Sequence, residues 1–115
     1  MSNTIAHKVG DSITWQINYK QSDGTPVNLT GTTISIDAIN KANRANKEVL
    51  FNILSTANDP NSYLVINEIS GIISVIIKDT TTFKLGTYDV DIEFTDSLGF
   101  KRSSKSFILK VLERL

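Results

Sequence analysis

The stretch GTYDVDIEFTDSLGF, residues 86–100, carries the clearest structural signal in the sequence. Apolar and acidic residues alternate along it with a period of two, the pattern of a β-strand that buries one face and exposes the other. The DSLG segment at 96–99 has the composition of a tight turn. The stretch therefore predicts a half-buried strand that turns back into a following strand. Its inward residues are Tyr88, Val90, Ile92 and Phe94.

The same period extends outward from this stretch over most of the chain. SITWQINYK at 12–20 alternates in the same way, and the Asp23-Gly24 pair followed by Pro26 predicts a turn after it. The most apolar segment, 71–78, is expected to be a central strand covered on both faces. Asp79 is expected to cap a short helical turn over 79–85. The predicted strands are 12–20, 32–39, 48–54, 63–66, 71–78, 87–94 and 100–113.

Strands at this spacing, without long crossover segments, predict an all-β fold. We expect an immunoglobulin-like antiparallel β-sandwich of about seven to eight strands, forming one domain over residues 1–115. KLGTY at 84–88 resembles the tyrosine corner of such sandwiches, with Tyr88 bonded to upstream backbone and Leu85 as a core partner. An ordinary inward-facing aromatic at Tyr88 is the equally weighted alternative.

Composition excludes several function classes. Lys+Arg and Asp+Glu number 12 each, and no long block of one sign occurs, so a nucleic-acid partner is not expected. There are no cysteines, which removes disulfides, thiol nucleophiles and thiolate metal sites. The N-terminus has no signal-peptide pattern, and no apolar run is long enough to span a bilayer. The sequence predicts synthesis in a cytoplasm and no membrane partner.

The carboxylates of 86–100 are candidates for an acid/base or calcium site. Asp89, Asp91 and Glu93 would form a straight column on one strand face, with Asp96 in the turn. A straight column does not converge on one ion as a calcium loop does, and it lacks the facing carboxylates of a glycosidase cleft. We favour a solvent face paired with the basic last strand.

Two hairpin registers would supply the partner for that acidic face. In one register Glu93 lies opposite Arg102, and in the other, slipped by one residue, Asp91 lies opposite Lys105. Either would give a weak cross-strand charge pair.

Other chemically active residues give weaker signals. His7 is the only histidine, which rules out a usual zinc site or a His-dependent triad with a recognisable serine motif, and we expect it at the surface or a sheet edge. No catalytic, cofactor-binding or metal-binding residue is predicted, no cofactor is expected, and the protein is not expected to be an enzyme. The basic loop of Lys41, Arg44 and Lys47 could meet phosphate or an acidic partner, but a solvated loop is favoured.

A small module binding cell-surface glycan is the alternative function. Its mark would be exposed aromatic side chains beside amides. Trp15, Tyr19 and Tyr88 lie in phase with apolar neighbours and are expected in the core, which argues against this alternative.

The order of motifs along nearly the whole chain resembles a β-sandwich domain of bacteriophages, the N-terminal domain of phage upper-baseplate proteins. The segments that carry the resemblance are VGDSITWQINY, DGTPVNLTGTTISIDA, ISGIISVIIKDTTTFKLGTYDVDIEFTDSLGF and SFILKVLE. The matching residues are Gly10, Asp11, Gly24, Pro26, Val27, Leu29, Thr30, Gly31, Gly71, Ile73, Gly86, Tyr88, Ile92, Glu93, Asp96 and Gly99.

The resemblance implies a non-enzymatic virion structural protein that acts by protein–protein docking. Its partners would be other virion proteins, with a homo-oligomer left open, and its location would be the virion. Because no shaft or receptor-binding domain follows the sandwich, we expect a tail, baseplate, neck or decoration component rather than a host-recognition protein. Its docking surface is expected at sheet edges and at the loops 40–47 and 55–62.

Overall fold

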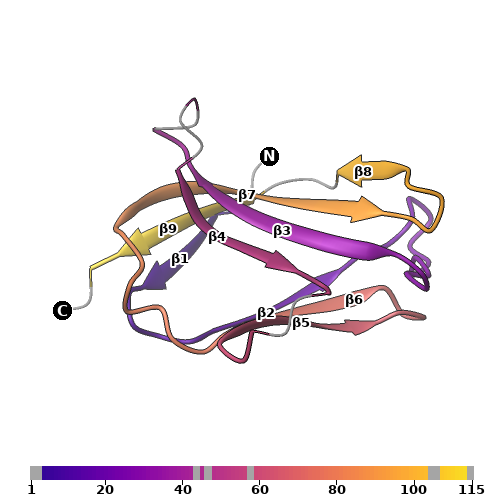
Figure 1. Ribbon diagram of the computed structural model, residues 1–115, viewed down its shortest axis with the longest axis horizontal. Helices are drawn as coiled ribbons and strands as arrows, with labels where there is room; N and C mark the ends of the chain where they lie inside the picture. The colour runs from indigo at the N-terminus through magenta and orange to yellow at the C-terminus, as the bar shows by residue number, and fades with distance from the viewer. Residues whose placement is uncertain (1–3, 43–44, 46–47, 57–58, 104–106, 114–115) are drawn as a thin grey trace.

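The computed structural model describes residues 4–42, 45, 48–56, 59–103 and 107–113, and these residues form an all-β fold (Figure 1). No helix among them is long and apolar enough to cross a membrane. Nine strands occur in the described ranges: β1 (Thr4–Lys8), β2 (Ile13–Asn18), β3 (Thr33–Asn40), β4 (Val49–Leu54), β5 (Ser62–Asn67), β6 (Ile72–Ile77), β7 (Gly86–Thr95), β8 (Lys101–Ser103) and β9 (Phe107–Leu112).

The strands form two sheets that lie one above the other in Figure 1. One sheet has the order β1-β9-β7-β3-β4, with β8 also paired to β7, and the other has the order β2-β6-β5. All pairs are antiparallel except β1 with β9, which is parallel. The predicted all-β class is confirmed, while the expectation of a wholly antiparallel structure is wrong at β1.

The core lies between the two sheets and is built by the alternation seen in the sequence. On β7 the residues Tyr88, Val90, Ile92 and Phe94 are buried, as the opening stretch predicts. Since both sheets contribute to one continuous apolar cluster, burying this face stabilises the two layers together. The remaining buried apolar residues are Ile13, Leu29, Ile34, Ile36, Ala38, Ile53, Ile73, Val75, Ile77, Leu109 and Val111.

The tyrosine corner is present at the start of β7. The Tyr88 hydroxyl donates to the backbone carbonyl of Lys84 over 2.8 Å. Burial, with the charge of Glu48 adding to it, raises the pKa of Tyr88, so the phenol stays protonated and able to donate. Leu85, however, is 54% exposed, so its predicted role as a core partner is wrong. Leu85 lies just before β7, where the strand alternation has not yet begun.

The last predicted strand, 100–113, contains both β8 and β9, and residues 104–106 between them lie outside the described residues. Glu93 lies opposite Ser103 and Val90 lies opposite Phe107, so the last segment advances four residues while β7 advances three. The pairing register with β7 therefore shifts by one residue between β8 and β9, and an alternation pattern alone does not reveal such a shift.

Two further expectations need correction. Segment 79–85 contains no helical residue; instead the Phe83 amide donates to the Thr80 carbonyl over 3.0 Å, which closes a tight turn. Asp79 does accept from the Thr81 amide and hydroxyl, at 2.9 and 2.8 Å, as a capping residue would. β6 is central in its sheet, but Ile72 and Ile76 on its outer face are only half-buried, because no further layer covers that face.

Candidate docking surface

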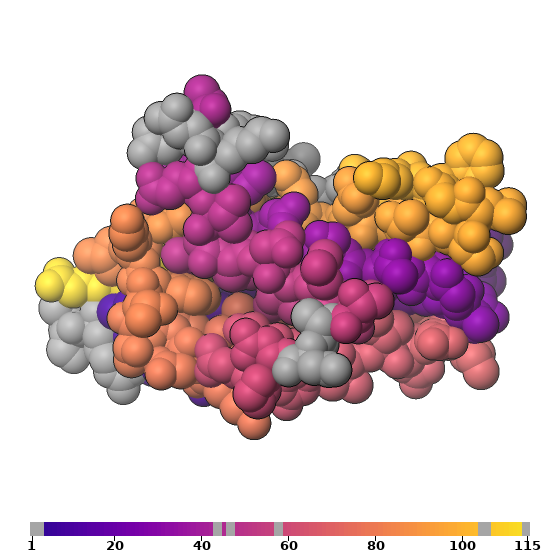
Figure 2. All heavy atoms as spheres, in the orientation of Figure 1, coloured from indigo at the N-terminus to yellow at the C-terminus, as the bar shows by residue number. Residues whose placement is uncertain are grey.

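Three connections meet at one end of the two-layer structure, and we call this region the loop end. They are the β2–β3 connection (19–32), the β5–β6 turn (68–71) and the β7–β8 turn (96–100). Their atoms gather at the right of Figure 2. The pairing of Thr33 with Thr95 and of Asn40 with Tyr88 puts Asn40, where the predicted docking loop 40–47 begins, at the opposite end of the molecule.

Backbone hydrogen bonds fix the first two connections to each other. The Tyr19 amide donates to the Gly71 carbonyl over 2.8 Å, and the Leu29 amide donates to the Glu68 carbonyl over 2.7 Å. Gly71 has a φ of 66°, and a Cβ there would lie 2.6 Å from the Tyr19 carbonyl oxygen and 2.7 Å from that of Val27. Only glycine fits this position without displacing the backbone around it.

The β7–β8 turn is held by Asp96. Its Oδ1 accepts from the amides of Leu98 and Phe100, at 2.9 and 3.0 Å, and its own amide donates to the Phe100 carbonyl over 3.0 Å. Gly99 adopts a φ of 89°, which favours glycine. The role of Asp96 in shaping the turn, predicted from the sequence, is therefore confirmed.

The loop end presents the three most exposed large hydrophobic side chains among the described residues. Leu98 is 81% exposed, Ile69 is 78% exposed and Phe100 is 65% exposed. Single exposed apolar residues are common on proteins, but several at one end of a molecule are a mark of an interaction surface. From the sequence, Leu98 was predicted only as part of a turn and Phe100 only as the first residue of a strand. An apolar pair flanking a turn glycine was the signal that could have found them.

An open cleft of about 260 Å³ lies between the β2–β3 connection and the β7–β8 hairpin. Tyr19 and Phe94 stack within it, with ring centroids 4.3 Å apart and an angle of 10° between the rings. Exposed Phe100 and Arg102 lie on the hairpin side of the cleft. The lining residues are Tyr19, Val27, Asn28, Leu29, Thr30, Thr32, Phe94, Asp96, Phe100 and Arg102.

The acidic column is the polar outer face of the larger sheet. Asp89, Asp91 and Glu93 alternate with the buried residues of β7 and are half-buried. On neighbouring β3, Asp37 lies opposite Asp91, and its Oδ1 accepts from the Asn52 side chain of β4. No group of three or more His, Cys, Asp or Glu side chains in the described part of the chain could hold a metal ion.

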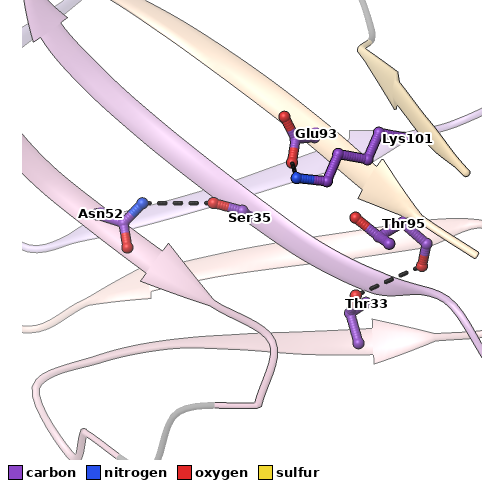
Figure 3. Close-up of polar contacts among 6 residues, drawn as sticks. All are labelled: Thr33, Ser35, Asn52, Glu93, Thr95 and Lys101. Carbon is purple, nitrogen blue, oxygen red and sulfur yellow. Dashed lines mark hydrogen bonds and ion pairs between the residues drawn. The ribbon is translucent and has the colours of Figure 1, made fainter. Parts of the chain in front are cut away.

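The hairpin register differs from the first of the two predicted alternatives. Arg102 lies opposite Phe94, not opposite Glu93. Glu93 instead pairs with Lys101 at 3.9 Å, a diagonal contact between two exposed side chains (Figure 3). The second alternative placed Asp91 opposite Lys105, and Lys105 lies outside the described residues. A cross-strand charge pair is thus confirmed, with a different basic partner.

A second hollow, of about 270 Å³, lies on the outer face of the larger sheet. Hydroxyl groups dominate it, including Thr33, whose Oγ1 donates to the Thr95 carbonyl over 3.4 Å (Figure 3). No aromatic ring lines this hollow, so it lacks the stacking surface that most sugar sites use. The full lining is Thr33, Ile34, Ser35, Leu54, Ser55, Thr56, Glu93 and Thr95.

His7 is buried, with 8% exposure, so its expected surface position is wrong, although β1 is an edge strand as expected. The fully buried Thr80 hydroxyl donates to the Asp11 carbonyl over 2.6 Å and accepts from the Gly10 amide over 2.9 Å. Since that hydroxyl has only one proton, the 2.9 Å contact with His7 Nε2 must be donated by the histidine. Burial lowers the pKa of His7, with Asp11 opposing this shift, and the ring is a structural donor.

The structure also places the aromatic residues expected in the core and part of the basic loop. Trp15 is half-buried and lies edge-on to Phe107, with ring centroids 5.3 Å apart, so its core placement is confirmed. Tyr19 packs against the core as well. Lys41 is exposed, whereas Arg44 and Lys47 lie outside the described residues.

The fold and the loop end define an all-β, two-sheet protein with an apolar-tipped surface at one end. No protein-family model matches the chain, and no curated protein matches it either.

Proposed function

We propose that the chain is a non-enzymatic immunoglobulin-like docking module and a structural component of a phage or prophage virion. Its location would be the tail, baseplate, neck or decoration layer. The loop end would be the surface that contacts another virion protein. The single observation that carries the docking role is the exposure of Leu98, Ile69 and Phe100 at one end of the molecule, where Phe100 also lines an open cleft.

Strand order supports the immunoglobulin-like assignment. The order β9-β7-β3-β4 corresponds to strands G, F, C and C′ of a variable-type domain, and β2-β6-β5 corresponds to strands B, E and D. The tyrosine corner at Tyr88 falls at the start of the F-equivalent strand, where such sandwiches carry it. In this assignment the loop end contains the B–C and F–G connections, which variable domains use for binding.

The virion role is supported by the resemblance of the motif order to phage baseplate-associated domains. Its turn glycines include Gly24, Gly71 and Gly99, each with positive φ, so they shape the same connections that form the loop end. These positions support the resemblance in fold. The virion assignment itself rests only on the resemblance to the phage domains.

The glycan-binding alternative has less support from the described surface. All nine aromatic residues fall within the described ranges, and Phe100 is the only exposed one. A single ring beside the Asn28 amide is a weaker sugar platform than a row of exposed rings. The calcium alternative is tested by calorimetric titration of the protein with calcium, where binding heat would support it.

The virion assignment is tested by mass spectrometry of gradient-purified particles from a strain that carries this gene in an inducible phage or prophage. We expect peptides of this chain at a fixed ratio to the major tail or capsid proteins. Their absence from intact particles, together with their presence in the cell lysate, would contradict the assignment.

A further inference from the structure

Resting on the proposed docking function, we propose that the outer edge of β8, which pairs with no other described strand, and the adjacent cleft form a groove for an extended acidic segment of a partner protein. The segment would add as a strand beside β8. An acidic side chain would reach Arg102, and a neighbouring apolar side chain would lie against Phe100.

The backbone of β8 has bonding capacity on its outer edge. Among the described residues β8 pairs only with β7. The Asp96 amide bonds to the Phe100 carbonyl, and bonded pairs alternate along an antiparallel ladder. Arg102 therefore directs its N–H and C=O toward Phe94, while Lys101 and Ser103 direct theirs away from β7. An added strand could bond to these two residues, as in recognition by strand addition.

The cleft beside this edge contains hydrogen-bond donors that have no acceptor among the described residues. The Arg102 guanidinium and the Tyr19 hydroxyl line it, and neither group makes a hydrogen bond or ion pair within the described part of the chain. Asn28 also lines it; its amide oxygen accepts from the Thr30 amide and hydroxyl, at 2.9 and 2.6 Å, so only its amide nitrogen is left to donate. The carboxylate of Asp96 is already engaged with two backbone amides. A ligand that supplies acceptors fits this set, and a carboxylate matches the planar fork of arginine best.

The apolar surface in the same cleft favours an apolar residue near the acidic residue of the bound segment. Phe100 and Arg102 are two apart on the hairpin and both line the cleft. Side chains two apart on an added strand also share a face, so an acidic residue and an apolar residue at i and i+2 could meet this pair together. The recognised pattern is thus an acid and an apolar residue separated by one position.

The charges of β8 argue against a second copy of this chain as the occupant. Pairing β8 with β8 of another copy would bring Lys101 and Arg102 near the same two residues of the partner, and like charges on facing strands are destabilising. Basic residues on an exposed edge are also a known protection against self-pairing. An acidic strand would meet no such repulsion at this edge. The charges of β8 therefore favour a segment of a different protein as the occupant.

The test uses a combinatorial library of seven-residue peptides with blocked termini, screened with the folded protein. We expect the selected peptides to be enriched in Asp or Glu two positions from an aliphatic or aromatic residue. Binding of a selected peptide, followed by fluorescence anisotropy, should weaken at least tenfold in Arg102→Glu. It should also weaken in Ser103→Pro, which removes an outward N–H but leaves the bonds of Arg102 to β7.

The control is Lys110→Glu, the same charge change at an exposed position of β9 away from the cleft, which should bind like the original chain. No acidic enrichment, or equal binding by Arg102→Glu and Lys110→Glu, would overturn the proposal. So would binding to sialylated or uronic-acid glycans in place of peptides. If the chain binds the peptides but is missing from purified particles, only the virion role is refuted. If the chain is present in the particles but binds no peptide, only this inference is refuted.

Discussion

Tyr88 shows how one side chain ties local and global structure together. Its ring is buried in the core between the two sheets, while its hydroxyl donates to the carbonyl of Lys84, four residues upstream. The ring also packs across Gly86, where an added Cβ would lie 3.6 Å from it. The corner therefore fixes the path by which the chain enters β7, the strand at the centre of the larger sheet.

Replacing Tyr88 with Phe should lower the free energy of unfolding by about 1 kcal/mol, because the Lys84 carbonyl loses its donor while the ring stays in place. Urea denaturation followed by circular dichroism measures this loss. Tyr63→Phe is the control, since its hydroxyl makes no hydrogen bond within the described residues, and it should change stability by less than about 0.5 kcal/mol. Equal effects of the two substitutions would contradict the role assigned to the corner.

His7 should make stability depend on pH in the mildly acidic range. Burial lowers the pKa of the folded state, so the unfolded chain binds more protons, and stability falls as pH drops. The loss begins near the unfolded value of 6.5 and is complete below the lowered folded value. The carboxyls of Asp23 and Asp79, whose pKa values hydrogen bonds lower from 3.8, act only at more acidic pH.

The measurement is the urea midpoint at pH values from 7.5 to 5. In His7→Gln, whose amide can still donate to Thr80, the decline over this range should largely disappear. A decline of the same size in His7→Gln would show that another group causes it.

At the scale of elements, Gly71 joins the β5–β6 hairpin to the β2–β3 connection. Gly71→Ala should cost about 3 kcal/mol or more, since it combines positive-φ strain with overlap against two backbone oxygens. Gly24→Ala, at a φ of 89° with nothing within 4 Å of the new Cβ, should cost only about 1 to 2 kcal/mol. Thermal unfolding of both variants tests the difference, and equal costs would contradict the crowding at Gly71.

The elements also show which parts of the fold were predictable. β2, β3 and β7 were found because apolar and polar residues alternate along them, and β6 because it is the most apolar segment. The predicted strands 48–54 and 63–66 correspond to β4 and β5. β1 was missed, since it is short and pairs in parallel with the distant β9, a long-range contact that the sequence does not reveal. The burial of His7 was missed for the same reason, although its spacing from Ile5 and Val9 placed it in phase with apolar neighbours.

At the scale of the whole molecule, the candidate site was the least predictable feature. The turn at 96–99 was predicted from its residues. That it lies at the same end of the molecule as 19–32 and 68–71 could not be predicted, because this depends on how the two sheets pack. The predicted docking loops 40–47 and 55–62 stay predictions. Among their described residues no large apolar side chain is exposed, whereas the loop end has three.

Removing the apolar tips should separate docking from folding. The double substitution Ile69→Ser and Leu98→Ser should leave the thermal midpoint nearly unchanged, because both side chains are largely exposed. It should nevertheless reduce the amount of the chain incorporated into purified particles, measured by quantitative mass spectrometry. Normal incorporation of a folded double variant would contradict docking through these residues.

Site-specific photocrosslinking in assembled particles tests the docking role of the loop end most directly. A photoreactive phenylalanine analogue at position 98 is compared with the same analogue at position 112, an exposed leucine on β9 away from the loop end. Docking through the loop end predicts a crosslink from position 98 to another virion protein and little or none from position 112. Crosslinks from position 112 alone, or none from position 98 in particles that contain the chain, would contradict it.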